Sequence, residues 1–336
     1  MPGEAIRPLK GIPIMQRLFR HAAVAVAALA TGHAAAQAWP SKPVRIIMET
    51  APGSVFDTAF RALSPQLGQQ LGQPFVIENR PGASGIVALE TCTRAAPDGY
   101  TVCGISTNGY SFTPHLFTKV PYDVERDFKP VSNVVLMIDG LVTSVSLPVN
   151  SLQELQALAV SKPGGLNFGT LGEGSSVDFF RRLLGEQWKT NLVGIPYKGG
   201  ANLTAAGLMS GEIDLSWGSL GSWIGGINGG KIKLHAVASS KRLAQFPNIP
   251  TFAEVKLSGI GRVFYGIAMQ AGTPDTIVSR LNAEVVKALA ETKVVEAIAG
   301  RFLEPDPRSI TDFAAFLKED RERAGTLVRK YNVPRQ

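Results

Sequence analysis

Two loops of this sequence combine glycine, serine and aspartate in a way that suits the binding of a small anion. Residues 51–57 read APGSVFD and residues 169–178 read GTLGEGSSVD, and each loop follows a short apolar, strand-like segment. A helical pattern begins within each loop. The N-terminus of a helix offers free N–H donors and the positive end of the helix dipole to an anion. The two loops are therefore predicted to cradle a carboxylate from two sides.

The same loops also have a purely structural explanation. Ser54 stands three residues before Asp57, and Ser175 stands three residues before Asp178. Ser-x-x-Asp is a capping sequence that starts a helix without any ligand. A Gly-x-Gly sequence in the second loop resembles part of a dinucleotide fingerprint, but the third glycine and the later acidic residue are missing. Capping and anion binding both remain open, whereas a nucleotide site has little support.

The sequence contains few residues that could act in catalysis. Beyond the N-terminal leader the histidines are His115 and His235, and there is no Gly-x-Ser-x-Gly elbow or paired metal-ligand spacing. Cys92 and Cys103 have no histidine near them in the sequence. We therefore expect neither an enzyme nor a metal site, and no cofactor; a small-molecule hydrolase is the least favoured alternative.

Short strand-like segments alternate with longer helical patterns along most of the chain. Strands are predicted at 43–48, 74–79, 100–105, 166–169, 192–195, 213–217 and 232–237. Helices are predicted at 55–71, 83–95, 152–160, 177–188, 202–209, 274–289 and 310–331. This alternation is typical of an α/β protein in which mostly parallel sheets are covered by helices.

Two long apolar, β-prone segments flank the central block and suggest that the chain crosses to a second lobe and later returns. The expected division is a signal peptide at 1–36, lobe 1 at 37–138 with 263–336, lobe 2 at 139–262, and a hinge near 131–145 and 261–271. In such a protein the ligand lies between the lobes, at the carboxyl ends of strands.

The N-terminus has the pattern of a secretory signal peptide. Arg17 and Arg20 precede an unbroken apolar stretch at 22–30, and small residues follow. A membrane anchor would need ~20 apolar residues, about twice what this stretch supplies. We therefore expect the leader to be cleaved after Ala36 or Ala38 and the protein to be exported.

Composition and charge exclude some classes of partner. The chain is 45% hydrophobic and 18% charged, with a formal charge of +7. Removal of the leader lowers this to about +4, and the remaining basic residues are scattered, so we expect no nucleic-acid partner. Cys92 and Cys103 would enter a compartment that permits disulfides, but a bridge and two buried thiols both fit their spacing.

The run at 78–101, ENRPGASGIVALETCTRAAPDGYT, reads as a strand end, a Gly-Pro turn, a helix and a second turn. It resembles the solute-binding receptors of the tripartite tricarboxylate transporters, the Bug group of bacterial periplasmic proteins, which carry ENRPGA and APDGYT turns in this order. The resemblance covers essentially the whole mature chain. It implies a monomeric two-lobe periplasmic binding protein of type II, or Venus flytrap, form.

The resemblance also implies a function and a site. The receptor would capture a small organic solute and deliver it to membrane transporter subunits; a sensor protein is the alternative partner. Lys198 is interpreted as an exposed turn residue. The expected ligand-binding residues are Pro52, Gly53, Ser54, Val55, Asp57, Thr107, Asn108, Thr170, Gly174, Ser175, Ser176, Asp178, Tyr197, Asp214 and Ser216.

Departures from the family pattern concern charge. Glu49, Glu173 and Asp178 stand in or beside the two loops, where relatives commonly have uncharged residues or a histidine. Two unit charges ~4 Å apart interact by about 4 kcal/mol at an effective dielectric of 20. If these acids face the cleft they disfavour a tricarboxylate, although solvated or helix-capping acids are the alternative. The expected solute is a small carboxylate, an amino acid or an amide.

Overall fold

The computed structural model describes residues 3, 39–197, 201–257 and 261–336, and the chain falls into two compact units, 1–41 and 42–336. Every named helix and strand of the described residues belongs to the second unit. The predicted signal peptide, apart from residue 3, and Lys198 lie outside the described residues. No helix in the described part of the chain is long and apolar enough to span a bilayer.

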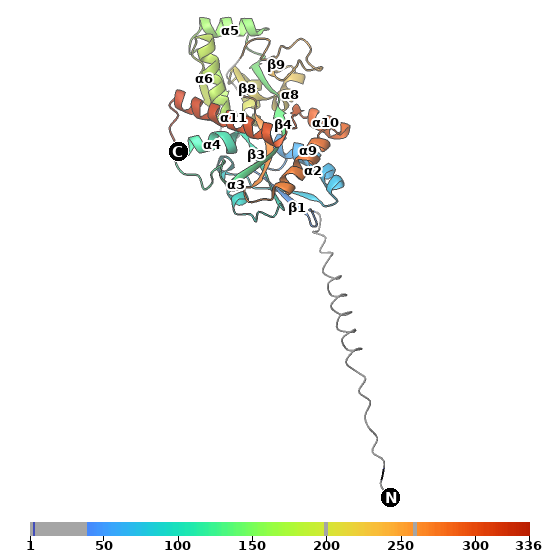
Figure 1. Cartoon of the computed structure of the whole chain (residues 1–336). Helices are drawn as coiled ribbons and strands as arrows, with labels where there is room; N and C mark the ends of the chain where they lie inside the picture. The colour runs from blue at the N-terminus through green and yellow to red at the C-terminus, as the bar shows by residue number, and fades with distance from the viewer. Residues whose placement is uncertain (1–2, 4–38, 198–200, 258–260) are drawn as a thin grey trace. The chain divides into compact units, whose positions relative to one another are not determined.

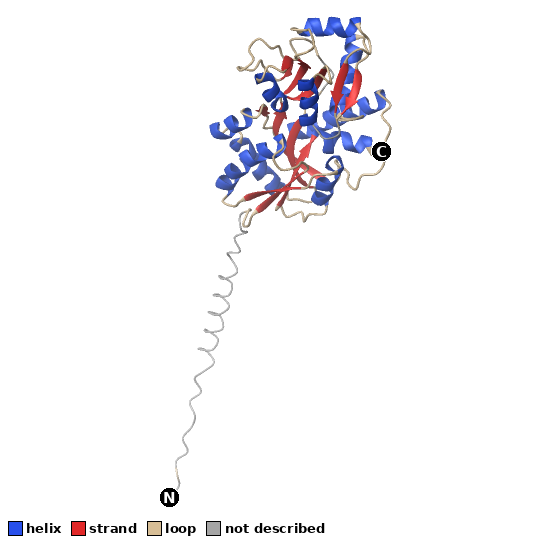
Figure 2. Ribbon diagram, turned by 180° about the vertical axis from the view of Figure 1, so that it is seen from behind, coloured by secondary structure: helices blue, strands red, loops and turns tan. Residues whose placement is uncertain are grey.

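Two β-sheets form the centre of this unit, with helices around them (Figures 1 and 2). The first sheet, in spatial order, consists of β11 (Leu303–Pro305), β4 (Phe128–Met137), β10 (Phe264–Gln270), β3 (Thr101–Ser106), β1 (Val44–Met48) and β2 (Phe75–Asn79). The second consists of β7 (Val193–Pro196), β6 (Asn167–Thr170), β8 (Leu215–Ser219), β5 (Asp139–Ser144) and β9 (Ile232–Ala238). The α/β, two-lobe fold is confirmed.

Both sheets are mixed, which corrects the expectation of mostly parallel sheets. β1 is parallel to β2 and β3, and β6 is parallel to β7 and β8, but β10 and β5 are antiparallel to both of their neighbours. β4 leaves the first sheet at Met137, β5 opens the second at Asp139, and β10 later re-enters the first. A strand that leaves a sheet and its neighbour that returns must run in opposite directions, and hydrophobic periodicity carries no information on direction.

Helices pack on both sheets. Against the first sheet lie α2 (Val55–Leu71), α3 (Ile86–Thr93), α9 (Asp275–Ala288) and α11 (Ile310–Lys330), with α4 (Thr113–Leu116) and α10 (Thr292–Ala299) nearby. Against the second lie α6 (Ser176–Trp188), α7 (Ala201–Ser210) and α8 (Leu220–Asn228), and α5 (Leu152–Ser161) packs on α6. Two short turns complete the first lobe, η2 (Ala83–Gly85) and the π-helical η3 (Thr107–Phe112).

One apolar cluster joins elements of the two lobes. Phe112 of η3 stacks on Phe179 of α6 with ring centroids 5.2 Å apart, and Leu327, Val328 and Val333 pack with them. We call this group the interlobe cluster. Polar contacts extend it, because the Tyr331 hydroxyl and Lys330 ammonium both reach Glu186 of α6, at 2.9 and 2.6 Å. The C-terminal helix is thus fastened to α6.

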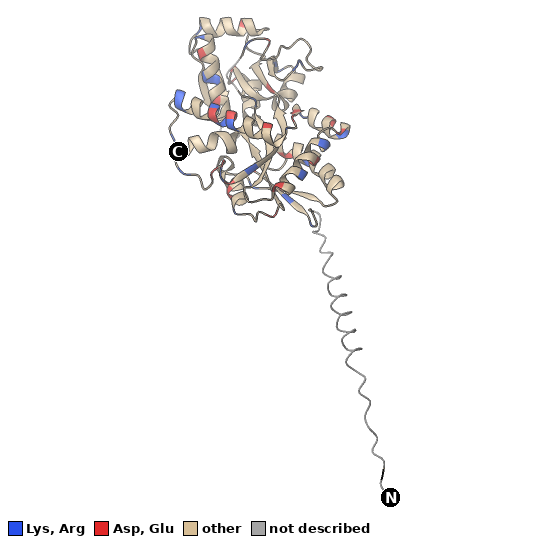
Figure 3. Ribbon diagram, viewed as in Figure 1, with Lys and Arg blue, Asp and Glu red and all other residues tan. Residues whose placement is uncertain are grey.

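Charged residues of both signs are interspersed over α6, α9 and α11 (Figure 3). Many of them form ion pairs, including Lys330 of α11 with Glu186 of α6 and Lys129 of β4 with Asp275 of α9, each 2.6 Å apart. This distribution agrees with the scattered charge that the sequence predicts.

Candidate functional site

The first loop is built around the buried carboxylate of Asp57. Ser54 caps α2 by accepting the N–H of Asp57, and Asp57 in turn accepts hydrogen bonds from Gly53 N at 2.9 Å, Arg61 Nε at 2.7 Å and Asn79 Nδ2 at 2.9 Å. Burial opposes ionisation of Asp57, but these donors outweigh it and lower the pKa of the carboxyl below its usual value. Asp57 therefore holds its own loop in place.

The second loop repeats this construction. Ser175 caps α6 by accepting the N–H of Asp178, whose carboxylate accepts from Gly174 N at 3.3 Å, Arg181 Nη2 at 2.7 Å and Arg182 Nε at 2.9 Å. The Arg182 guanidinium also binds Glu173 at 2.9 Å. Two of the three acids expected to repel an anion are thus paired with arginines, and Asp178 also accepts from Gly174 N at the start of α6, which favours the helix-capping alternative over free charges at the cleft.

Glu49, the third acid, is buried at the end of β1 with 8% of its surface exposed. Burial raises the pKa of Glu49 to about 7, although hydrogen bonds from Ser106 and Gly109 act in the opposite direction. A side chain in place of Gly85 or Gly109 would collide with the Glu49 carboxyl group. Near neutral pH this acid is partly uncharged, so it repels an anion less than an ordinary carboxylate would.

The N-termini of α2 and α6 line one cavity of about 210 Å³, which we call the central cavity. The predicted site residues among its lining are Ser54, Val55, Asn108, Ser176 and Ser216. These residues come from elements of both lobes. The structure therefore brings the two predicted loops together.

Each helix presents unused N–H groups at this cavity. In α2 the first backbone bond is from Thr58 N to Ser54 O, and in α6 it is from Phe179 N to Ser175 O. The caps take the third N–H of each helix, which leaves the N–H groups of the first two residues without an intrahelical acceptor. Two helix N-termini that meet at one cavity can bind a carboxylate.

A larger hollow of about 780 Å³ adjoins the central cavity and shares Thr50, Asn108 and Leu171 with it. Gly174 and Ser175 of the predicted site line this outer hollow, together with Glu49 and Glu173. The remaining predicted residues line neither space: Pro52, Gly53, Asp57, Thr107, Thr170, Asp178, Tyr197 and Asp214.

Several of these remaining residues have structural partners. Thr107 Oγ1 accepts the N–H of Phe264 at 2.9 Å, which ties η3 to β10. Asp214 accepts the N–H of Asn167 at 2.7 Å, which ties β8 to β6. Burial raises the pKa of the Tyr197 hydroxyl, and the nearby carboxylate of Glu212 raises it further. These contacts position the strands behind the cavity.

The aromatic wall of the central cavity was missed by the sequence reasoning. Phe56, Trp217, Trp223 and Tyr265 line it, with Met137 and Val263 near the crossing between the lobes. Phe56 follows Val55 directly, and Trp217 follows Ser216, so both were adjacent to predicted positions. Nothing local in the sequence marked Tyr265, because only the return of β10 brings it to the site.

Cys92 of α3 and Cys103 of β3 are joined by a disulfide in the core of the first lobe. His235 lies buried with Nε2 2.8 Å from Thr143 Oγ1, and burial lowers the pKa of its imidazole to about 4. His115 Nε2 lies 3.1 Å from the carbonyl oxygen of Arg321. In the described part of the chain no group of three or more His, Cys, Asp or Glu could hold a metal ion.

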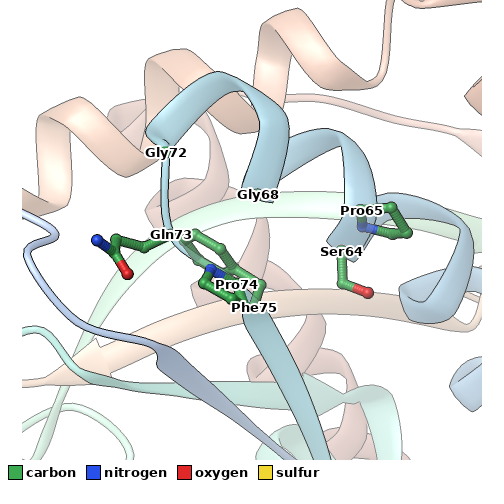
Figure 4. A pocket seen from close by; sticks show the side chains of 7 residues that line it. All are labelled: Ser64, Pro65, Gly68, Gly72, Gln73, Pro74 and Phe75. Carbon is green, nitrogen blue, oxygen red and sulfur yellow. The ribbon is translucent and has the colours of Figure 1, made fainter.

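Another hollow, of about 370 Å³, lies at the C-terminal end of α2 and the start of β2 (Figure 4). Figure 4 shows Gln73 and Pro74 on the segment that links the helix to the strand. The described residues that line it include no ionisable side chain. None of its lining residues belongs to the loops at 51–57 and 169–178, and it adds nothing to the candidate site.

A buried acid at the crossing between the sheets yields a test of stability against pH. Asp139 has no exposed surface, and neither carboxyl oxygen has a hydrogen-bond partner among the described residues. Burial raises the pKa of Asp139 to about 8, although Arg262 acts in the opposite direction. The folded state therefore binds a proton that the unfolded state releases above its ordinary pKa of 3.8, so the contribution of Asp139 to stability is greatest below that pKa and is lost as the pH rises toward about 8.

We expect Asp139→Asn to be more stable than the wild type by about 1–3 kcal/mol at pH 8, because it removes a buried, unpaired charge. At pH 5 the difference should shrink. Thermal melts at both pH values measure this, with Asp275→Asn as the control at an exposed carboxylate. A wild-type stability that rises from pH 5 to pH 8 relative to Asp139→Asn would contradict the expectation.

Comparison with known proteins places these features in context. A family model described as "Tripartite tricarboxylate transporter family receptor" matches residues 59–333. The chain is 29% identical to Protein BugT of Bordetella pertussis, over 88% of this chain and 91% of that protein.

Two solved structures with bound ligands also resemble the chain. One is a Rhodopseudomonas palustris protein with bound malate, MatC, which is 28% identical with a TM-score of 0.71 and covers 86% of this chain and 100% of its own. The other, from R. palustris with adipate, is 25% identical with a TM-score of 0.77 and covers 89% and 100%.

Proposed function

We propose, because the chain belongs to the tripartite tricarboxylate transporter family of receptors, that it delivers a small carboxylated or amide-type solute to a transporter of that type. The family is one of periplasmic solute-binding receptors, which are not enzymes. The chain would capture its solute in the periplasm, after cleavage of the predicted leader. It would act as a monomer.

One observation carries this proposal: the N-termini of α2 and α6 line the same cavity. Each helix N-terminus is equivalent to roughly +0.5 elementary charge, so the pair offers about one positive charge. The described lining contains no lysine or arginine that would add to it. About one positive charge at the cavity matches a solute that carries a single carboxylate, or a neutral solute whose amide dipole points at the helix ends.

The domain division at 37–138 with 263–336 and at 139–262 belongs to the same proposal, with the hinge near 131–145 and 261–271. The strand order supports it, because β4 ends at Met137 and β5 begins at Asp139 in the other sheet. Closure of the lobes would bring the two helix ends onto the solute. Such ligand-dependent closure is the signal that a membrane transporter can recognise.

Calorimetric titration of ligand-stripped protein tests the proposal. We expect at least one of malate, adipate, aspartate, glutamate, benzoate or nicotinamide to bind at micromolar concentration, and native mass spectrometry of protein from its own periplasm to show a retained solute. Failure of every carboxylate and amide to bind would contradict it. Tight citrate binding would refute the charge balance alone.

A further inference from the structure

The central cavity has an aromatic wall whose rings are held in fixed orientations. The rings of Phe56 and Tyr265 are stacked with centroids 4.0 Å apart, and those of Trp217 and Phe180 are stacked at 4.7 Å with 3° between their planes. Phe56, Trp217, Trp223 and Tyr265 all line the cavity. Rings that are already stacked on a neighbour do not turn freely, so the wall presents rigid aromatic surface to a solute.

Three polar groups at this wall lack partners among the described residues. They are Thr204 Oγ1, Trp217 Nε1 and Ser219 Oγ, and their residues are 1%, 2% and 8% exposed. All three residues line the central cavity. A buried polar group without a hydrogen bond is costly and rare, so each one calls for an explanation, and a bound solute would supply the partner.

Other polar groups in the same lining do have hydrogen-bond partners within the protein, so the three groups without partners differ from their neighbours. Trp223 Nε1 donates to the carbonyl oxygen of Gly218 at 3.1 Å, and Ser216 Oγ donates to the carbonyl oxygen of Gly169 at 2.9 Å. The indole N–H of Trp217 can only donate, whereas the two hydroxyls can donate or accept. The matching group on the solute must therefore accept at least one hydrogen bond.

Charge and size restrict that group further. No Lys, Arg, His, Asp or Glu occurs among the described residues that line the central cavity. A second carboxylate placed against the wall would be desolvated without a counter-charge, which is costly. An apolar cavity of about 150 Å³ is enough to hold benzene. The central cavity, at about 210 Å³, therefore has room for one six-membered ring with small substituents.

On the premise of the proposed function, we propose that the solute is a flat, ring-bearing monocarboxylate with an uncharged hydrogen-bond acceptor. Its carboxylate lies at the N-termini of α2 and α6, and its ring lies against the wall formed by Phe56, Trp217, Trp223 and Tyr265. A ring nitrogen, carbonyl or hydroxyl on the ring accepts from Trp217 Nε1 and meets the hydroxyls of Thr204 and Ser219. Linear dicarboxylates fit this wall poorly.

The test compares four acids by calorimetry on ligand-stripped, full-length protein: pyridine-3-carboxylate, benzoate, cyclohexanecarboxylate and succinate. We expect pyridine-3-carboxylate to bind best and succinate to bind at least tenfold more weakly than benzoate. The variant Trp217→Phe keeps an aromatic ring but removes the N–H. It should lower the affinity for pyridine-3-carboxylate by about tenfold, which is the expected effect of losing one hydrogen bond in a site without water. The affinity for benzoate should stay within about twofold of the wild-type value.

Trp188→Phe is the matched control, because Trp188 is 5% exposed and does not line the central cavity. It should leave all four affinities unchanged, and thermal melts establish that both variants are folded. If Trp217→Phe proves unstable, Ser219→Ala provides a second, independent test, because it should also lower the affinity for pyridine-3-carboxylate.

Two outcomes would overturn the inference. In the first, succinate binds more tightly than any ring acid, in which case the proposed carboxylate receptor stands and the ring-bearing class is wrong. In the second, Trp217→Phe weakens benzoate as much as pyridine-3-carboxylate, so the indole N–H is no specific partner. Absence of binding by every acid would instead count against the proposed function itself.

Discussion

Val55→Asp is expected to reduce the affinity for a carboxylate solute by about 100- to 1000-fold. Val55 is the first residue of α2 and lines the central cavity, so the new carboxylate would stand beside the site of the bound anion. Two unit charges ~4 Å apart repel by about 4 kcal/mol at an effective dielectric of 20, which corresponds to roughly a thousandfold. Calorimetry with the best-binding acid measures the loss.

The position allows a clean interpretation, because an acidic residue in the first turn of a helix is stabilising. Val55→Asp should therefore fold normally, and its thermal midpoint should stay within a few degrees of the wild type. Val55→Asn is the matched neutral control and should retain affinity within about fivefold, since it adds no charge. Equal affinities of the Asp and Asn variants would show that the anion lies elsewhere.

Loss of the disulfide is expected to have the largest effect on stability. Cys92 and Cys103 are 11 residues apart in sequence and are 1% and 0% exposed. Closing a loop of about this length stabilises a protein by about 3 kcal/mol. The double variant Cys92→Ala with Cys103→Ala should lose this amount in urea unfolding monitored by circular dichroism.

Reducing agent supplies the internal control for that measurement. Reductant should lower the unfolding midpoint of the wild type toward that of the double variant, and it should leave the double variant unchanged. A loss below about 1 kcal/mol would mean that packing alone holds α3 against β3.

The local parts of the site could be predicted from the sequence. Ser54 and Ser175 cap their helices as the Ser-x-x-Asp pattern indicates, because capping depends on residues only three positions apart. The same pattern left two explanations open for Asp57 and Asp178. The arginines that bind Asp178 from within α6 lie one turn along the helix, so this pairing was also within reach of the sequence.

The tertiary parts could not be predicted. Tyr265 reaches the cavity only because β10 lies between β3 and β4, an order that no local pattern fixes. The unpartnered Trp217 Nε1 is visible only once its surroundings are known, since tryptophan in a strand usually means core. The mixed direction of the strands could not be predicted either, because hydrophobic periodicity indicates which residues are buried and not which way a strand runs.

The interlobe cluster bears on how fast solute can exchange. Phe112 and Phe179 stack across the two lobes, and Lys330 and Tyr331 hold Glu186 beside them. If the lobes must part to admit a solute, these contacts have to break first, so opening would precede binding. Stopped-flow association rates should then level off at high solute concentration, at the opening rate, where diffusional capture would keep rising. The contacts of the C-terminal helix would in that case limit the rate at which solute enters and leaves. The loops at 51–57 and 169–178 and the aromatic wall would determine which solute is bound.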